Sequence, residues 1–214
     1  MRTVAVMPIK LQNERCPGKN TRLLGNQPLL NHQLFNLLQV KEIDEIYVYC
    51  SDESIASILP QRVKFLKRDA NLDLPTSNFS QIFTAFMSEI DADIYVYDHA
   101  TAPFISIETI SQCLNAVQAH SYDSAFCATK IQDFLWQNGK PLNFDATNIP
   151  RSQDLQPIYR ETSGVYVFTK EVFMKHHRRI GLKPFIHEVS YKEAIDINNP
   201  EDFQLAEAML NINL

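Results

Sequence analysis

Short apolar runs alternate along the chain with longer segments whose apolar residues recur at helical spacing. The short runs cover residues 4–9, 46–50, 63–66, 94–97 and 124–129, lengths typical of strands buried in a sheet. Helical spacing places three sets of residues on common helix faces: Leu30, Leu34, Leu37 and Leu38; Ile82, Phe86 and Ile90; Ile107, Ile110, Leu114 and Val117. This alternation predicts βαβ units, and therefore an α/β fold with three layers around a mostly parallel sheet.

Polar residues mark the expected starts of helices. The segment 51–54 (Ser-Asp-Glu-Ser) and Ser106 offer side-chain oxygens that can cap a helix N-terminus. Asn199 followed by Pro200 and two acidic residues predicts the start of a last helix, which we expect to run through Leu210.

The strand and helix rhythm stops between residues 131 and 160. A turn at 138–141 (Asn-Gly-Lys-Pro) separates apolar residues that include Phe134, Trp136 and Phe144. We expect a single domain over residues 1–214, with 131–160 as an inserted flap. An isolated hairpin is marginally stable, so the flap needs a surface to pack on. A second subunit, giving a homodimer, is one such surface, and the chain's own domain is the other.

Composition narrows the class of partner. The 214 residues carry a net charge of −5 with both signs interspersed, which argues against a nucleic-acid surface and favours a small-molecule ligand. We expect no membrane span and no signal peptide, because apolar runs are short, and hence a cytoplasmic protein. The four cysteines are widely spaced, which predicts reduced and mostly buried thiols.

Candidate chemistry gathers in the connection after the first strand. Lys10, Arg15 and Lys19 lie there together with Gly18. A triphosphate needs guanidinium and ammonium groups and closely approaching backbone N–H donors, and these residues supply those groups. A solvated basic loop is the alternative interpretation.

Two later connections carry further polar residues at the same expected edge of the sheet. Arg68, Ser77 and Asn78 follow the strand at 63–66, and 98–103 (Asp-His-Ala-Thr-Ala-Pro) follow the strand at 94–97. Ligands of open α/β sheets bind beyond the carboxyl ends of the strands, so all these loops can line one crevice. Neither a dinucleotide-binding glycine motif nor a Walker loop occurs in the sequence.

Residues 8–19 (Pro-Ile-Lys-Leu-Gln-Asn-Glu-Arg-Cys-Pro-Gly-Lys) resemble the P-A-R-x-x-S-x-R-L-P-G-K opening of sugar-activating cytidylyltransferases. The resemblance continues through 25–29, 69–77 and Thr101-Ala102-Pro103, then through 151–160 before a Gly-x-Tyr-x-Phe strand at 164–168, and it ends at 195–203 (Ile-Asp-Ile-Asn-Asn-Pro-Glu-Asp-Phe). The later motifs are similar to acylneuraminate (CMP-sialic acid type) synthetases, and the first loop equally to the 3-deoxy-octulosonate branch. The resemblance implies a nucleotidyltransferase fold of Rossmann-like type.

The resemblance also implies a reaction, in which the anomeric hydroxyl of an acidic keto-sugar attacks the α-phosphorus of CTP and pyrophosphate leaves. Mg²⁺ is the expected cofactor. It assigns Arg15 and Lys19 to the β- and γ-phosphates and Lys10 to the attacked phosphate. The other implied nucleotide contacts are Asn13, Gly18, Asn20, Arg68, Ser77 and Asn78.

The remaining implied residues concern the metal and the sugar. Asp196, expected at the end of a short strand, is the metal candidate together with Asn198, and helix capping is its alternative role. Asp98 is either a second ligand or a solvated carboxylate. His99 stands where sialate enzymes have glutamine, so with Thr101 it is a candidate sugar contact, or else an ordinary loop histidine. Arg160, and less directly Arg151, lie in the flap where a carboxylated sugar favours a bidentate arginine.

Two positions depart from the family pattern. Lys10 replaces an arginine, which keeps the charge and loses the planar fork, and Asn198 replaces the second aspartate of I-D-I-D, which removes one negative charge from the metal site. Three functions therefore stay open: a cytidylyltransferase for a nonulosonic or octulosonic acid, a nucleotide-binding protein of the same fold with impaired catalysis, and a nucleotide-sugar glycosyltransferase. The last normally needs a D-x-D motif after a central strand, which residues 98–100 do not provide.

Overall fold

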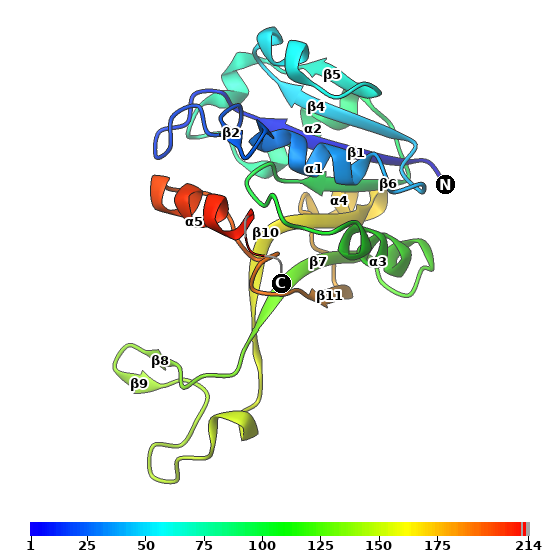
Figure 1. Ribbon diagram of the computed structural model, residues 1–214. Coiled ribbons are helices and arrows are strands. Elements are labelled where there is room, and N and C mark those ends of the chain that lie inside the picture. Colours follow the sequence, from blue (N-terminus) through cyan, green and yellow to red (C-terminus); the bar gives the residue numbers. More distant parts are fainter. Residues whose placement is uncertain (211, 213–214) are drawn as a thin grey trace.

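The computed structural model describes residues 1–210 and 212 and contains one central sheet of seven strands in the order β11-β7-β10-β6-β1-β4-β5 (Figure 1). Strands β1, β4, β5 and β6 are parallel to one another, β11 is parallel to β7, and β10 runs antiparallel to both of its neighbours. The strands are β1 (Thr3–Ile9), β4 (Glu45–Cys50), β5 (Val63–Lys67), β6 (Ile94–Asp98), β7 (Ser124–Ile131), β10 (Ile158–Thr169) and β11 (Pro184–Glu188).

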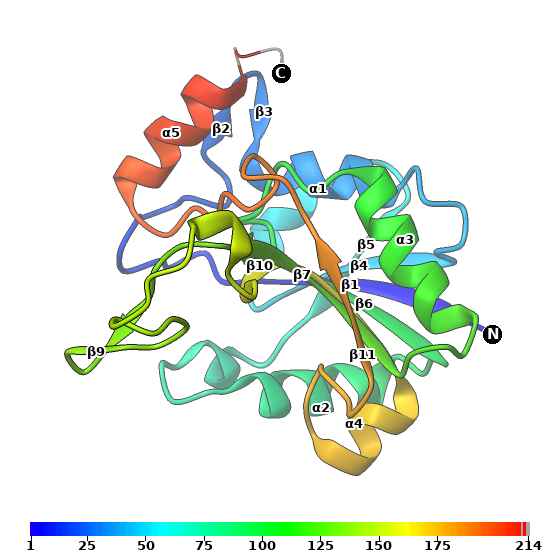
Figure 2. The ribbon, with the colours of Figure 1, turned by 90° about the horizontal axis from the view of Figure 1, so that it is seen from below.

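Helices cover both faces of this sheet, which gives three layers (Figure 2). The helices α1 (Leu29–Leu37) and α3 (Ile107–Gln118) lie on one face, and α2 (Phe79–Glu89) and α4 (Lys170–His176) lie on the other. The predicted mostly parallel three-layer α/β fold is therefore confirmed. A further helix, α5 (Pro200–Leu210), packs beside the short β2 (Leu23–Leu24) and β3 (Gln27–Pro28) ribbon, and it ends where the sequence predicts.

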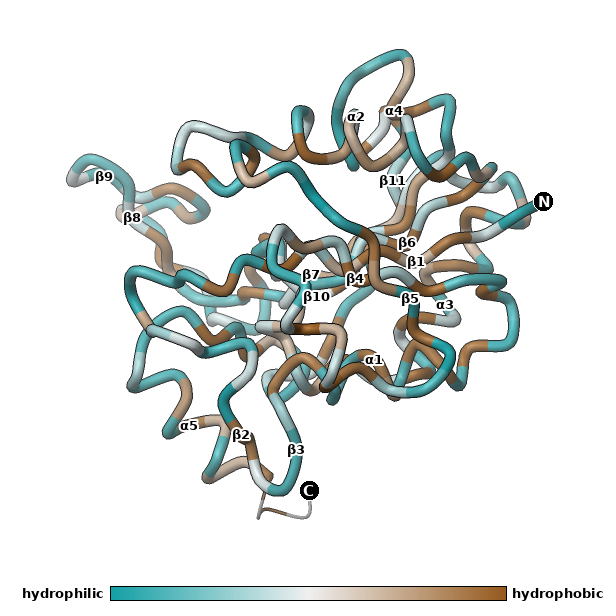
Figure 3. Tube along the Cα trace, turned by 90° about the horizontal axis from the view of Figure 1, so that it is seen from above, coloured by the Kyte–Doolittle hydropathy of each residue, from teal (hydrophilic) through white to brown (hydrophobic). Residues whose placement is uncertain are grey.

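The period-two alternation of the strands separates two cores. In β1, Ala5 and Met7 face the aliphatic cluster under α1 and α3, and Val4 and Val6 face an aromatic cluster under α2 and α4. The tube coloured by hydropathy shows apolar residues concentrated along these central strands (Figure 3). Burial of both faces explains why the sequences of the inner strands β1, β4 and β6 are nearly continuous apolar runs rather than alternating ones.

Capping agrees with the sequence at two of the expected positions. Ser106 accepts a hydrogen bond from the Thr109 backbone N–H at the start of α3. Asp52 accepts one from the Ser54 N–H, but it begins a short 3₁₀ helix (Glu53–Ile58) rather than an α-helix. All four cysteines are buried free thiols, as predicted.

The 131–160 segment leaves the body between β7 and β10 and extends away from it (Figure 1). It carries the two-residue strands β8 (Trp136–Gln137) and β9 (Lys140–Pro141). The rings of Phe134 and Trp136 both pack edge-on against Phe144, at centroid distances of 4.9 and 5.5 Å. We call residues 132–157 the arm.

Candidate active site

Three adjoining cavities lie at the carboxyl edge of the parallel strands. The first, of about 380 Å³, is lined by residues that include Lys10, Lys19, Arg68, Ser77 and His99. The second, of about 550 Å³, is lined by residues 160–163 of β10, the segment before α5 and the start of α5. The third, of about 330 Å³, shares Lys10, Asn13, Lys19 and Pro75 with the first and Arg15 and Asn198 with the second.

The first loop forms a tight turn that aims Lys19 into these cavities. Gly18 has φ +66°, a conformation that residues with a side chain adopt only with strain. Its carbonyl oxygen accepts the backbone N–H groups of Thr21 and Arg22, both at 3.1 Å, while the Lys19 N–H donates to the Cys16 carbonyl oxygen. The glycine predicted to give backbone freedom thus closes the turn that places the lysine.

Lys19 is a buried cation at the junction of the cavities. Its side chain is 8% exposed, and its Nζ donates a 2.5 Å hydrogen bond to the Ile197 carbonyl oxygen. Burial lowers the pKa of Lys19, and the Arg15 guanidinium lowers it further, while the Asp196 carboxylate acts in the opposite direction. An incoming phosphate would offset this burial cost with a second negative charge.

A chain of hydrogen bonds connects Arg15 to Asp196 through Asn198. Arg15 Nη2 donates to Asn198 Oδ1 at 2.7 Å, and Asn198 Nδ2 donates to Asp196 Oδ2 at 2.7 Å. The backbone N–H groups of Asn198 and Asn199 both donate to Asp202 Oδ2, at 2.9 and 2.8 Å. The sequence placed Arg15, Asp196 and Asn198 in one site, but it did not single out Asp202 for this role.

The predicted short strand at Asp196 is wrong. Residues 195–198 are not part of any strand. Ile197 holds the segment instead, because its N–H donates to the Thr101 carbonyl oxygen at 2.8 Å and its carbonyl oxygen accepts Lys19 Nζ. Ile197 is fully buried with Leu24, Leu29 and Phe203, so the side chains before and after it in sequence line the second cavity.

Asp196 has the donor chemistry that Mg²⁺ prefers. Its Oδ1 is buried and has no hydrogen-bond partner in the described part of the chain. Residues 1–210 and 212 contain no group of three or more His, Cys, Asp or Glu side chains arranged to hold a metal. Mg²⁺ is often bound by one or two carboxylates together with substrate phosphates and water, so a single protein carboxylate fits the ion if the substrate supplies further oxygens.

Polar side chains shape the nucleotide side of the site. The amide nitrogens of Asn13 and Asn20 both donate to the Lys10 carbonyl oxygen, at 3.1 and 2.9 Å, and each amide oxygen is buried without a partner among the described residues. Ser77 lines the first cavity. The neighbouring Asn78 does not, and its side chain instead caps α2 by accepting the Gln81 N–H.

Arg68 is a buried cation on the floor of the first cavity. It donates to the Ile9 carbonyl oxygen at 2.7 Å, pairs with Asp73 and lies over the Tyr49 ring. Its charge is therefore largely neutralised within the protein. The sequence singled out Arg68, whereas Asp73 was missed because no local spacing signals a partner that neutralises a buried arginine.

The predicted sugar contacts lie on two cavities. His99 and Thr101 line the first, while Arg160 lines the second and donates through Nε to Thr129 Oγ1 at 3.3 Å. Burial lowers the pKa of His99 to about 4, and Arg179 adds to this effect. The imidazole is therefore neutral near pH 7 and offers one donor and one acceptor. Arg151 pairs with Asp154 within the arm and lines none of the three cavities.

Asp98 is buried outside the three cavities. Neither carboxylate oxygen has a hydrogen-bond partner in the part of the chain that the structure describes. Burial raises the pKa of Asp98 well above its ordinary value. Asp98 is thus not the solvated carboxylate that the sequence allowed.

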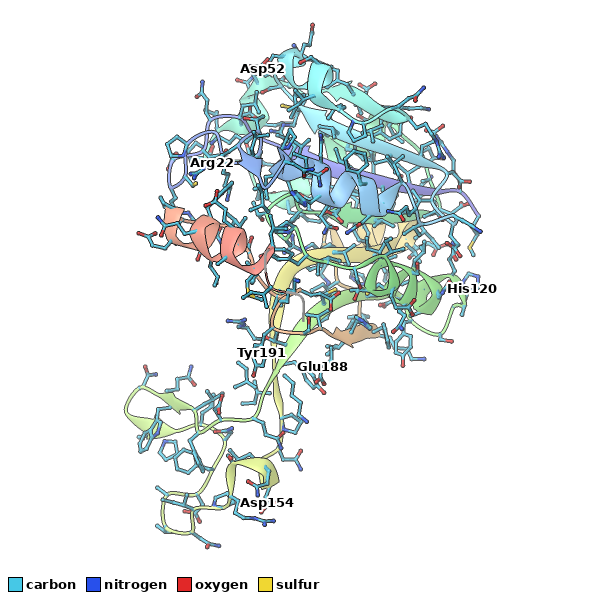
Figure 4. The ribbon with its side chains drawn as sticks, viewed as in Figure 1. Arg22, Asp52, His120, Asp154, Glu188 and Tyr191 are labelled. Atoms are coloured by element: carbon cyan, nitrogen blue, oxygen red, sulfur yellow. The ribbon has the colours of Figure 1, made fainter. Side chains whose placement is uncertain are left out.

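A polar cluster beside the second cavity, which Glu161 lines, was missed from the sequence. Tyr166 donates to Glu161 Oε1 at 2.5 Å, Arg179 Nη2 donates to the Tyr166 hydroxyl at 3.0 Å, and the guanidinium lies 3.7 Å from the Tyr166 ring centroid. These residues come from β10 and from the turn after α4. No motif connects them, because the contact depends on the turn after α4 lying against β10. Tyr191, also missed, lines the second cavity and lies where the arm meets the body (Figure 4).

The chain matches a known protein family. The sequence profile of a family described as Cytidylyltransferase matches residues 4–212. The chain is 27% identical over 234 residues to CMP-N,N'-diacetyllegionaminic acid synthase of Legionella pneumophila, with 100% of this chain and 98% of that protein aligned. It is 24% identical to N-acylneuraminate cytidylyltransferase of Oncorhynchus mykiss over 89% of the chain, which spans 46% of that protein's length.

A solved structure shows the same fold. CMP:2-keto-3-deoxy-manno-octonic acid synthetase complexed with CTP superposes with a TM-score of 0.72 and covers 98% of each chain. At 16% identity this likeness supports the architecture alone.

Proposed function

The chain belongs to the cytidylyltransferase family, and from this premise we propose that it transfers CMP from CTP to the anomeric hydroxyl of a nonulosonic (sialic acid-like) sugar, with release of pyrophosphate. One observation carries this proposal: the cavity that joins the other two is lined by three cations, Lys10, Arg15 and Lys19. A triphosphate placed across this junction would have its nucleoside in the first cavity and its acceptor sugar in the second. The sugar hydroxyl would then attack the α-phosphorus at this junction.

The cations act by binding charge that is already present and charge that develops on the leaving group. Lys19 is held by the Ile197 carbonyl and Arg15 by Asn198, so neither needs to reorganise far when pyrophosphate forms. Lys10 has its backbone carbonyl fixed by Asn13 and Asn20, which sets the start of its side chain at the junction. Phosphoryl transfer depends mainly on such positioning and charge stabilisation.

Asp196, whose Oδ1 has no partner among the residues that the structure describes, would hold the Mg²⁺ that this reaction class uses. When bound, the ion would neutralise charge on the phosphate oxygens.

The acceptor class follows from the second cavity and from the relatives. Arg160 lines that cavity without any ion pair among the described residues, so its guanidinium is available to an acidic sugar. The relative aligned over nearly its whole length makes a CMP-activated nonulosonic acid by its name. An octulosonic acid is the second candidate acceptor, since the first loop, residues 8–19, is equally similar to the 3-deoxy-octulosonate branch.

We further propose a homodimer assembled through the arm. Trp136 is 60% exposed and Leu142 52% exposed, although the arm carries its own small aromatic cluster. Aromatic and aliphatic side chains on an extended segment of this kind are typical of subunit interfaces. A cytoplasmic location agrees with four unpaired thiols and with CTP as a substrate. No helix in residues 1–210 or at 212 is long and apolar enough to cross a membrane.

Binding and turnover measured side by side test the proposal. We expect CTP to bind in a calorimetric titration, and CMP-sugar to form when Mg²⁺ and a nonulosonic acid are added. Lys19→Met should lower turnover by about 10²–10³-fold, the usual cost of removing one charge-stabilising donor. Lys175→Met removes the same charge from an exposed position on α4 and should leave turnover unchanged.

The outcomes separate the alternatives. CTP binding without product from any acidic sugar would support a binding protein of the same fold. Equal turnover in Lys19→Met and Lys175→Met would remove Lys19 from the mechanism.

A further inference from the structure

Asn198 occupies a position between two opposite charges. Its amide oxygen faces the Arg15 guanidinium and its amide nitrogen faces the Asp196 carboxylate, each at 2.7 Å. Both ends of the short side chain are therefore engaged within the protein, and the residue lines the junction of two cavities.

Only one orientation of this amide satisfies both neighbours. If it were reversed, the amide nitrogen would face the guanidinium, donor against donor, and the amide oxygen would face the carboxylate, acceptor against acceptor. The contacts on either side therefore fix the amide and leave its oxygen occupied by Arg15. This differs from the expectation that Asn198 is a metal ligand.

An aspartate at this position would change the charges of the same contact. Arg15 would still pair with one oxygen of that carboxylate, but the other oxygen would lie at hydrogen-bond distance from Asp196, and the two carboxylates would repel each other there unless a cation lay between them. The Asn198 amide needs no such cation, because it is uncharged and its N–H donates a hydrogen bond to Asp196. We propose that Asn198 is a positioning residue that holds Asp196 and Arg15 in place without a metal, so that this chain binds a single divalent ion through Asp196 Oδ1.

The backbone around Asn198 makes this arrangement rigid. Ile197, which precedes it, is bonded on one side to the Thr101 carbonyl and on the other to Lys19 Nζ. The Asn198 N–H is bonded to Asp202, which also accepts the Asn199 N–H through the same oxygen. Asp202 is thereby committed to the start of α5, and Asp196 Oδ1 is left as the buried carboxylate oxygen of this segment with no hydrogen-bond partner among residues 1–210 and 212.

The inference rests on the proposed nucleotidyl transfer, but its test does not require turnover. Three proteins are compared: the native chain, Asn198→Asp and Asn199→Asp. The last is a matched control, because it adds the same charge one residue away, outside the Arg15 and Asp196 contacts. Thermal unfolding is followed in EDTA and in Mg²⁺, and Mn²⁺ binding is measured by titration calorimetry without nucleotide.

We expect Asn198→Asp to unfold at a lower temperature than the native chain in EDTA, and we expect Mg²⁺ to raise its unfolding temperature to that of the native chain. We also expect this variant to bind Mn²⁺ about tenfold or more tightly, the scale on which neighbours of metal ligands act. The native chain and Asn199→Asp should show little response to metal before CTP is added. Equal unfolding temperatures and equal Mn²⁺ affinities in all three proteins would overturn the inference.

A second variant covers the case in which Asn198→Asp does not fold. Asn198→Ala introduces no charge, and we expect it to keep its CTP affinity and lose about 10–100-fold in kcat, with a higher Mg²⁺ concentration needed for half-maximal rate. An unchanged Mg²⁺ dependence in this variant would show that Asn198 does not position Asp196. If no acidic sugar supports turnover and Asn198→Asp still gains Mn²⁺ affinity, the proposed function fails and the inference stands.

Discussion

Lys19 Nζ lies 2.5 Å from the Ile197 carbonyl oxygen, across a separation of 178 residues in sequence. This hydrogen bond joins the cationic loop after β1 to the segment that carries Asp196 and Asn198. The loop supplies positive charge for a phosphate, and the segment supplies the carboxylate for a metal. The contact therefore fixes the distance between the two halves of the proposed chemistry.

We predict that Asp196→Asn removes most of the activity and keeps the fold. The amide preserves the shape of the side chain and removes its charge, while the contacts of Ile197 still hold the backbone. Turnover should fall by about 10²–10³-fold, and the unfolding temperature should change little. Steady-state kinetics and thermal unfolding of the same preparation measure both. Unchanged kinetics would exclude Asp196 from the mechanism.

We predict that His99→Gln keeps kcat within about threefold, because a neutral imidazole that only donates and accepts hydrogen bonds can be replaced by an amide. The pKa of His99 is lowered to about 4, chiefly by burial, so the side chain does not change charge between pH 6 and 9. The rate profiles of both proteins should have the same shape across this range. A rate limb near pH 6 to 7 that disappears in the variant would instead identify His99 as an acid or base.

The parallel strands β1, β4 and β6 could be predicted from the sequence because each is a nearly continuous apolar run. The start of β10 could not, since residues 158–161 are mostly exposed and pair with β7 beyond the body. The resemblance indicated only the part at 164–168. The register shift between Glu161 and Tyr166 interrupts the regular pattern of this strand.

The site was predictable where its residues are neighbours in sequence, as Arg15, Gly18 and Lys19 are. Its contacts were not, because Arg15 reaches Asn198 across 183 residues and no spacing rule reports such a pair. The buried partner of Arg68, Asp73, and the cluster of Arg179 with Tyr166 depend in the same way on tertiary packing.

Asp98 gives a prediction for stability against pH. Its folded pKa lies well above its unfolded value, so from about pH 4 upward the folded state retains a proton that the unfolded state has released. The free energy of unfolding contributed by this group therefore falls as pH rises, by up to about 1.4 kcal/mol per pH unit, until the folded pKa is passed.

Asp98→Asn cannot ionise, so its unfolding temperature relative to the native chain should rise as the pH is raised above about 4, where the unfolded carboxyl ionises. Urea or thermal unfolding at several pH values measures this difference. The same difference at every pH would show that the Asp98 carboxyl does not retain its proton on folding.

We predict that Trp136→Glu produces monomers. The side chain is largely exposed on the arm, and a charge there would have to be buried in the proposed subunit interface. Met174→Glu serves as the control, because Met174 is equally exposed but lies on α4. Sedimentation velocity should report a monomer for the first variant and a dimer for the second. A dimer in both would place the interface elsewhere than the arm.

Pyrophosphate release from CTP tests the central proposal most directly. The assay contains Mg²⁺ and, one at a time, sialic, legionaminic, pseudaminic and octulosonic acids, with ATP, GTP and UTP as controls. We predict release with CTP and not with ATP, GTP or UTP. We also predict that at least one nonulosonic acid supports faster release than the octulosonic acid. No release with any of these acids, in a protein that still binds CTP, would contradict the account.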